Sequence, residues 1–200
     1  LVVTTTNGAG TNHSAINWQS FSIPTGTVTQ FVQPSAASLS INRVVGGTSS
    51  LIDGTLTSNG KLVLVNPAGI AFGVGAVVDT AGFTASTLSM SDADAINGVL
   101  RFSNGGNAQG IQVEGRILAR EGDVFLIAPT VQVKEGAVIQ GPNGATVLAA
   151  GQSVQITGRG LEGIVMEVQA PADEAVNLGR MEAGAVGMFA GTLRHSGDIR

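Results

Sequence analysis

The second half of the chain repeats one short pattern, a glycine followed by an apolar strand, at nearly constant intervals. Four such strands (GDVFLIAP, GATVLAAG, GIVMEVQA and GAVGMFAG) follow one another at offsets of 22, 19 and 21 residues, and they begin at Gly122, Gly144, Gly163 and Gly184. A second series interleaves with the first, with Val113, Val133 and Val154 spaced 20 and 21 residues apart. Two strands per repeat predict stacked coils, because a coil this small buries its apolar face only against its neighbours. The sequence therefore predicts an all-β solenoid with coils of about 20 residues.

The glycine-led strands also predict which side chains line the core of the coils. Positions that recur on the apolar face of successive strands should point inward. An unpaired charge at such a position would cost several kcal/mol. The predicted inward positions are Val124, Leu126, Val147, Val165 and Met188.

Composition agrees with an all-β chain and narrows the class of function. The 200 residues include 29 Gly and no Cys, and only 12% are charged. Such a composition favours short strands and tight turns over helices. The net charge of −4 gives no attraction to phosphate backbones, so we expect no nucleic-acid partner. Many bacterial exported proteins have no cysteine, and a long β-stack does not need disulfides.

The repeat divides the chain into zones of one expected domain, residues 1–200. The first zone, residues 1–45, lacks the repeat, and its polar and apolar residues alternate with period two, as expected of strands that cap an end. The third zone, residues 89–110, is polar and less periodic, which indicates an excursion from the stack. No basic and apolar leader precedes the first zone and no cap follows the last coil, so we expect a fragment of a longer protein. The zones are 1–45 (N-terminal cap), 46–88 (first coils), 89–110 (excursion) and 111–200 (regular coils).

Two glycine-rich motifs of nucleotide-binding proteins occur without the context that they need. Gly158, Gly160 and Gly163 have the spacing of a dinucleotide fingerprint, but GIVMEVQA after them is an expected repeat strand rather than a helix. The segment GTLTSNGK ends at Lys61, and Leu62 stands where a phosphate-binding loop needs Ser or Thr. We interpret both segments as turns.

Candidate catalytic and metal-binding residues are few and scattered. His13 and His195 are the only histidines and are expected at opposite ends of the solenoid, which argues against a metal cluster or a Ser-His-Asp triad. Asp92 and Asp94 are the candidate carboxylate pair, and the polar segment around them, SMSDADAIN, indicates a solvated loop. We therefore expect no catalytic, cofactor-binding or metal-binding residue and no enzyme activity. A β-helical polysaccharide lyase or hydrolase is the alternative, because such enzymes also place carboxylates along one face.

Four segments together are more specific than any of these motifs. In chain order they are INWQSFSI from Ile16, INRVVGG from Ile41, LIDGTLTSNGKLVLVNPAGI from Leu51 and GFTASTL from Gly82. In order and spacing they resemble the TPS domain of two-partner-secretion exoproteins, also called the haemagglutination activity domain of filamentous haemagglutinin-like proteins. Within that family the high-molecular-weight adhesins are the most similar branch. The resemblance covers nearly the whole chain. It implies a right-handed parallel β-helix with an N-terminal β cap and a small extra-helical sheet.

The resemblance also implies a function and a partner. Domains of this family are secretion signals of large bacterial exoproteins, recognised in the periplasm by the POTRA domains of a TpsB-type outer-membrane transporter. Folding of the β-helix would begin with this domain at the cell surface. The resemblance implies neither catalysis nor a cofactor, and it favours an adhesin or haemagglutinin as the parent protein. A host-cell receptor or glycan would then bind through downstream sequence, and direct glycan binding by this domain is a further alternative.

Seven residues match the two recognition motifs of the family. The family's NPNL motif is absent, because FVQPSAAS stands in its place, and Ala68 replaces the second Asn of NPNGI. Asn followed by Pro suits a type I turn, and glycine permits the next corner. In the NRV motif, residues 42–44, we expect Arg43 to form an ion pair with Asp53 on the next coil. The pattern leaves open whether these segments contact the transporter or only shape the turns. The matched residues are Asn42, Arg43, Val44, Asn66, Pro67, Gly69 and Ile70.

Overall fold

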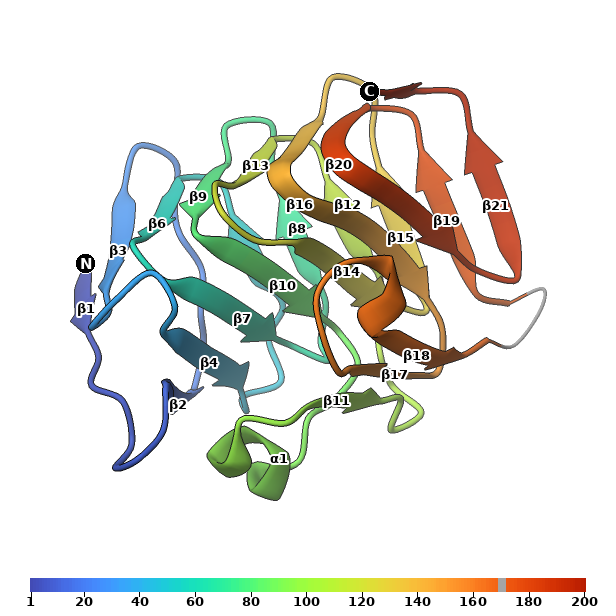
Figure 1. The fold of residues 1–200 in the computed structure, drawn as a ribbon. Helices are drawn as coiled ribbons and strands as arrows, with labels where there is room; N and C mark the ends of the chain where they lie inside the picture. The colour runs from blue at the N-terminus through green and yellow to red at the C-terminus, as the bar shows by residue number, and fades with distance from the viewer. Residues whose placement is uncertain (169–171) are drawn as a thin grey trace.

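The chain folds as a parallel β-helix whose coils stack along one axis, with the N-terminal coil at one end and the C-terminal coil at the other (Figure 1). The computed structural model describes residues 1–168 and 172–200. A complete coil gives one strand to each of three parallel ladders. Backbone N–H and C=O groups of one coil thereby pair with the coils before and after it. The predicted all-β solenoid is confirmed.

The three ladders contain most of the strands. The first comprises β1 (Val2–Thr4), β3 (Val28–Val32), β6 (Thr55–Ser58), β9 (Val77–Thr80), β13 (Arg116–Ala119), the first halves of β16 (Val138–Ala150) and β20 (Arg180–Phe189), and β22 (Asp198–Ile199). The second comprises β2 (His13–Trp18), β4 (Leu39–Val44), β7 (Lys61–Val65), β10 (Gly82–Ser86), β14 (Val124–Ala128) and the second halves of β16 and β20. The third comprises β5 (Ser50–Ile52), β8 (Ile70–Phe72), β12 (Ile111–Val113), β15 (Thr130–Val133), β19 (Glu174–Asn177) and β21 (Thr192–His195).

The main core fills the interior of the coils. Val78, Ile117 and Ile139 pair in register on successive rungs of the first ladder, and all three are fully buried. Stacking in register gives each side chain an apolar neighbour above and below, which is how a solenoid buries its strands. The N-terminal end of this core is closed by aromatic rings, with the centroids of Trp18 and Phe21 5.3 Å apart.

The predicted core positions are correct in part. Val124 and Leu126 are fully buried in the main core, and Met188 packs against it. Val147 is fully buried, but it faces the opposite side of its strand and belongs to a second core. Val165 is 62% exposed, so the prediction that it points inward is wrong.

The second core lies between the outer face of the second ladder and a small antiparallel sheet. This extra-helical sheet has the strand order β11-β17-β18, and Figure 1 places it beside the coils with α1 next to it. Its apolar side chains, such as Phe102 and Val154, cover Phe125 and Ile127 of β14. The extra-helical sheet that the resemblance implied is confirmed. Its elements are α1 (Asp92–Asn97), β11 (Leu100–Ser103), β17 (Ser153–Ile156), the 3-10 helix η1 (Leu161–Gly163) and β18 (Ile164–Glu167).

Two of the predicted repeat strands belong to this extra-helical sheet rather than to the coils. The strand after Gly163 is β18, which pairs antiparallel with β17, the strand that contains Val154. On the third ladder the strand that follows β15 is β19, so Val133 pairs with Asn177. The sequence misleads here because β17 and β18 also bury one apolar face, on the second core, and their alternation resembles that of a coil strand.

The expected loop around Asp92 and Asp94 is a short helix. The Oγ of Ser91 accepts the backbone N–H of Asp94 at 3.0 Å, which caps the start of the helix, and it donates to the Asp94 carboxylate at 2.7 Å. Gly98 ends the helix with a φ of 67°, in the left-handed region that glycine adopts without strain. Ser and Asp three residues apart are a helix-start signal, so the sequence contained the information for α1.

The strands within residues 1–45 join the parallel ladders. β3 pairs in parallel with β6, and β4 pairs in parallel with β7. The outer edges of β1 and β2 end their ladders at this end of the stack. Among the residues that the structure describes, no helix has the length and apolar character needed to cross a membrane.

Candidate functional site

The two motif segments lie side by side on the second ladder. Asn42 pairs with Leu64 and Arg43 pairs with Val65, so β4 runs along the strand that leads directly into Asn66. The backbone N–H of Asn66 donates to the carbonyl of Ser86 at the end of β10, 2.9 Å away. The fold therefore gathers segments 20 or more residues apart in sequence into one corner of the β-helix.

The buried side chain of Asn66 connects the segments of this corner by hydrogen bonds. This side chain has no exposed surface, and Nδ2 donates to the carbonyl of Thr48 at 3.0 Å and to Oγ of Ser50 at 2.9 Å. Its Oδ1 accepts the backbone N–H of Ala68 at 3.0 Å, which closes the turn after β7. Gly69 follows with a φ of 112°, a conformation that L side chains rarely adopt. The Asn-Pro-x-Gly pattern thus encodes a turn and its attachment to the preceding coil.

Asn42 has a comparable place on the neighbouring strand. It is 2% exposed, and its Oδ1 accepts the indole N–H of Trp18 at 3.0 Å. Its Nδ2 donates to the carbonyl and the hydroxyl of Ser40, each 3.1 Å away. A buried amide with partners on both ends stabilises one arrangement of its neighbours, because each partner would otherwise be unsatisfied. Asn42 therefore fixes the position of Trp18 in the N-terminal coil.

Arg43 connects the coils to the extra-helical helix. Its guanidinium forms an ion pair with Asp92 of α1, and the two side chains are 14% and 77% exposed. The expected pair with Asp53 is wrong, because the carboxylate that meets Arg43 comes from the excursion. Nothing in the sequence places residue 92 beside residue 43. Asp92 and Trp18 are thus the partners of the motif that sequence reasoning missed.

The other motif residues offer little surface to a partner of the folded domain. Val44 and Ile70 belong to the main core, and Gly69 is buried. Pro67 is only half-buried, and it shares this partial exposure with Arg43. A protein that binds the folded domain would therefore meet few atoms of these segments.

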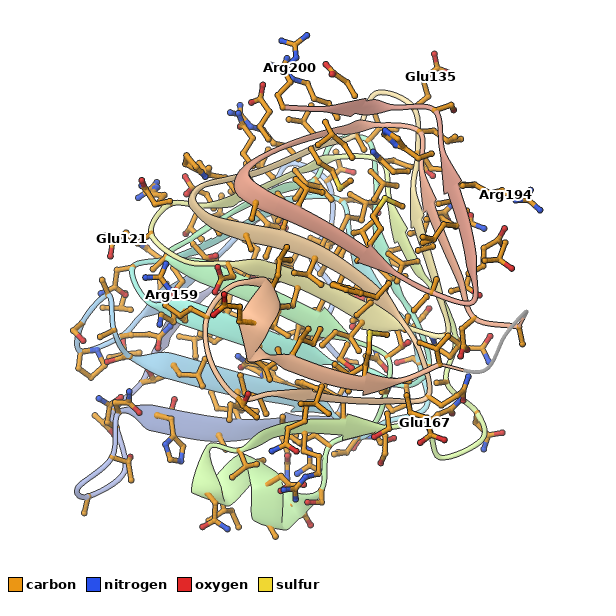
Figure 2. All side chains as sticks on the ribbon, turned by 45° about the vertical axis from the view of Figure 1, so that its right-hand side comes forward. Glu121, Glu135, Arg159, Glu167, Arg194 and Arg200 are labelled. Carbon is orange, nitrogen blue, oxygen red and sulfur yellow. The ribbon has the colours of Figure 1, made fainter. Side chains whose placement is uncertain are left out.

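Other candidate residues do not converge on one place. His13 makes a 2.8 Å hydrogen bond from Nε2 to the carbonyl of Ile96, and His195 lies 3.2 Å from the amide of Asn177 at the other end of the chain. Within residues 1–168 and 172–200, no group of three or more His, Cys, Asp or Glu side chains is placed to hold a metal ion. Figure 2 shows charged side chains such as Glu135, Arg194 and Arg200 projecting from the periphery. The glycine motif ends in η1 and then a strand, so no dinucleotide site forms.

The sequence model of the TPS secretion domain matches residues 1–198 of the chain. The chain belongs to the TPS secretion-domain family. The crystal structure of the HMW1 secretion domain from Haemophilus influenzae superposes with a TM-score of 0.86 and 34% identity, over 92% of this chain and 50% of that chain. The resemblance to two-partner-secretion exoproteins is therefore confirmed. As a TPS secretion domain, the chain serves the secretion of an exoprotein.

Two heme/hemopexin-binding proteins of Haemophilus influenzae share part of this TPS secretion domain. One, from strain KW20 / Rd, is 37% identical over 124 residues, which is 62% of this chain and 12% of that protein. The other is 41% identical over 78 residues, which is 39% of this chain and 8% of that protein. The chain thus spans a small fraction of the curated relatives that it matches.

Proposed function

We propose that this TPS secretion domain is recognised, before its coils close, by the POTRA domains of the TpsB-type transporter, and that it then nucleates β-helix folding at the cell surface. The proposal includes passage through the periplasm in an unfolded state. It rests on one observation above all: the seven motif residues of a secretion domain are buried or half-buried once the domain has folded.

Hydrogen-bonding capacity supports the same order of events. The side-chain amides of Asn42 and Asn66 form hydrogen bonds with groups inside the folded domain. In an unfolded chain the same side chains and the backbone of β4 and β7 are free to pair with another protein. An extended segment that adds to the edge of a partner's sheet gains main-chain hydrogen bonds, and its side chains supply specificity. Recognition would therefore precede burial.

Folding then follows from the architecture. Each coil presents an open strand edge on every ladder, on which the next coil pairs. The motif corner joins the turn after β7 to the segment before β5 through Asn66, so its formation completes the first coils. Stacking of later coils outside the membrane would bias movement of the chain outward.

The experiment separates recognition from folding by measuring both. Asn42→Ala and Asn66→Ala are made in the native chain and in an unfolded background that carries Leu126→Asp. Unfolding of the native-background variants gives the structural cost. Affinity of the unfolded-background variants for the purified POTRA domains gives the recognition cost.

Direct recognition predicts weaker binding of the two motif variants in the unfolded background, where stability plays no part. Asn143→Ala, an exposed asparagine outside the motifs, is the control and should bind like its parent. Unchanged affinity for both motif variants would reject direct recognition of these segments.

We further propose that the domain has no catalytic activity and that the parent protein is an adhesin. The secretion-domain family and the scatter of acids and bases support the first point. The similarity to the HMW1 secretion domain supports the second. Haem acquisition is the competing role for the parent, because two relatives are named for binding heme and hemopexin. Binding of the complete secreted protein to epithelial cells, compared with its binding to haem, distinguishes the two.

A further inference from the structure

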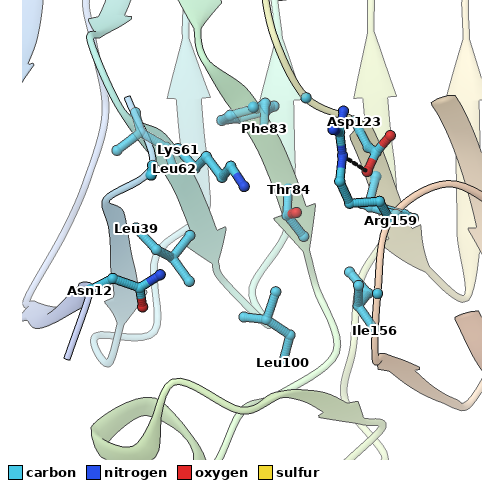
Figure 3. Close-up of a pocket in the computed structure, with 15 residues that line it drawn as sticks. Asn12, Leu39, Lys61, Leu62, Phe83, Thr84, Leu100, Asp123, Ile156 and Arg159 are labelled. Atoms are coloured by element: carbon cyan, nitrogen blue, oxygen red, sulfur yellow. Dashed lines mark ion pairs between the residues drawn. The ribbon is translucent and has the colours of Figure 1, made fainter. Parts of the chain in front are cut away.

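A small cavity opens on the outer face of the second ladder, beside the edge of the extra-helical sheet (Figure 3). Its volume is about 160 Å³. The apolar walls come from four elements far apart in the sequence: β4, β11, β14 and β17. The wall side chains are Leu39, Leu100 and Ile156, which Figure 3 labels, together with Phe125.

The cavity exists because two outward positions of β10 carry small residues. Gly82 pairs with Lys61 and Thr84 pairs with Val63 on the adjacent strand. A Cβ at Gly82 would lie 3.3 Å from Cγ of Lys61 and 3.7 Å from the carbonyl oxygen of Asp123. A larger side chain at this position would therefore fill the hollow between the neighbouring strands.

The uncompensated charge at the cavity is positive. In the part of the chain that the structure describes, the ammonium group of Lys61 has neither a hydrogen bond nor an ion pair, and Figure 3 shows it reaching over the cavity. The carboxylate of Asp123 is satisfied within the domain, because it accepts the N–H groups of Ala145 at 2.7 Å and Gly160 at 3.1 Å. The guanidinium of Arg159 lies 3.9 Å from the same carboxylate.

We propose that this cavity binds an aromatic carboxylate, with a phenyl-sized group against the apolar walls and the carboxylate on Lys61. Size supports the apolar half, since a dry cavity of about 150 Å³ lined by Leu, Ile and Phe is large enough for benzene. Charge complementarity supports the anionic half, because a carboxylate on an unpartnered ammonium makes a charge-assisted hydrogen bond. The walls meet only after β17 has paired with β11. The ligand therefore binds the folded domain alone and stabilises it.

The test titrates the 200-residue chain with 3-phenylpropionate. Lys61 and Lys134 are the only lysines, so ¹³C-dimethylation of lysine gives two assignable side-chain NMR signals. Saturable movement of the Lys61 signal alone is expected, with a dissociation constant of about 1 mM or lower for a ligand of this size. Lys61→Gln should weaken binding of 3-phenylpropionate about tenfold. The same variant should leave binding of neutral 3-phenylpropanol unchanged, and the matched control Lys134→Gln should change neither ligand.

A second variant tests the apolar half of the site. Gly82→Val fills the hollow with a side chain suited to a strand, and it should abolish binding of both ligands while the domain stays folded. If Gly82→Val does not fold, Thr84→Leu fills the cavity from the next outward position. The proposal is overturned if the Lys61 signal shows no saturable movement at about 10 mM ligand. Full affinity for 3-phenylpropionate in Lys61→Gln, or in a folded cavity-filling variant, would overturn it equally.

Discussion

Replacing Asn66 by alanine tests how much the motif corner contributes to the fold. The substitution removes three hydrogen bonds of a side chain with no exposed surface, two donated by Nδ2 and one accepted by Oδ1. At about 1 kcal/mol net for each bond, the free energy of unfolding should fall by about 3 kcal/mol. For a domain of this size, such a loss lowers the melting temperature by about 6–12 °C.

Urea and thermal unfolding followed by far-UV circular dichroism measure this cost. Asn143→Ala is the matched control, because it removes one hydrogen bond, 2.8 Å long, from an exposed asparagine to the carbonyl of Arg120. Its effect should stay within about 0.5 kcal/mol, as for most surface substitutions. An Asn66→Ala variant as stable as the Asn143→Ala variant would refute the conclusion that the NPxGI segment forms a buried attachment between coils.

Three further predictions follow from burial and charge. Leu126→Asp buries an unpaired carboxylate in the main core and should abolish cooperative thermal unfolding, whereas Val165→Asp, at a 62% exposed position, should change stability by no more than about 0.5 kcal/mol; a cooperative transition in the first variant would contradict the core assignment. A double-mutant cycle of Arg43→Ala and Asp92→Ala in urea unfolding should give a coupling energy below about 1 kcal/mol that decreases with salt, because Asp92 is 77% exposed; a coupling of 3 kcal/mol would show a buried pair instead. Addition of EDTA should leave the melting temperature within about 2 °C, and a larger decrease would reveal a structural metal ion.

Much of the fold could be predicted from the sequence because each coil of the solenoid repeats the same pattern of glycine and apolar residues. Gly122 and Gly144 lead coil strands as expected, and Val113 and Val133 lie on the third ladder. The prediction fails where local periodicity does not specify a partner. β18 alternates Ile164 and Met166 toward the second core, and this pattern does not distinguish an antiparallel excursion from the next coil.

The sequence locates the candidate site, but it does not predict which residues contact the motif side chains. Asn-Pro-x-Gly predicts a turn by its residue types, and the structure contains that turn. The partners of Asn42 and Arg43 are Trp18 and Asp92, 24 and 49 residues away along the chain. The contact of Arg43 depends on how the excursion packs against the coils, and the contact of Asn42 depends on the register of β2 against β4. No spacing rule encodes either arrangement. The sequence predicts Asp53 as the partner of Arg43 because Asp53 lies on the next coil, whereas the actual partner, Asp92, comes from the excursion.

In the proposed mechanism the transporter recognises the domain before the coils close. The most direct test compares the affinity of purified POTRA domains for the native chain and for the unfolded Leu126→Asp variant under identical conditions. If recognition precedes folding, the unfolded variant should bind at least as tightly as the native chain, because its motif segments are accessible. Binding of the native domain, with no binding of the unfolded variant, would contradict the account and would place the recognition surface on the folded β-helix.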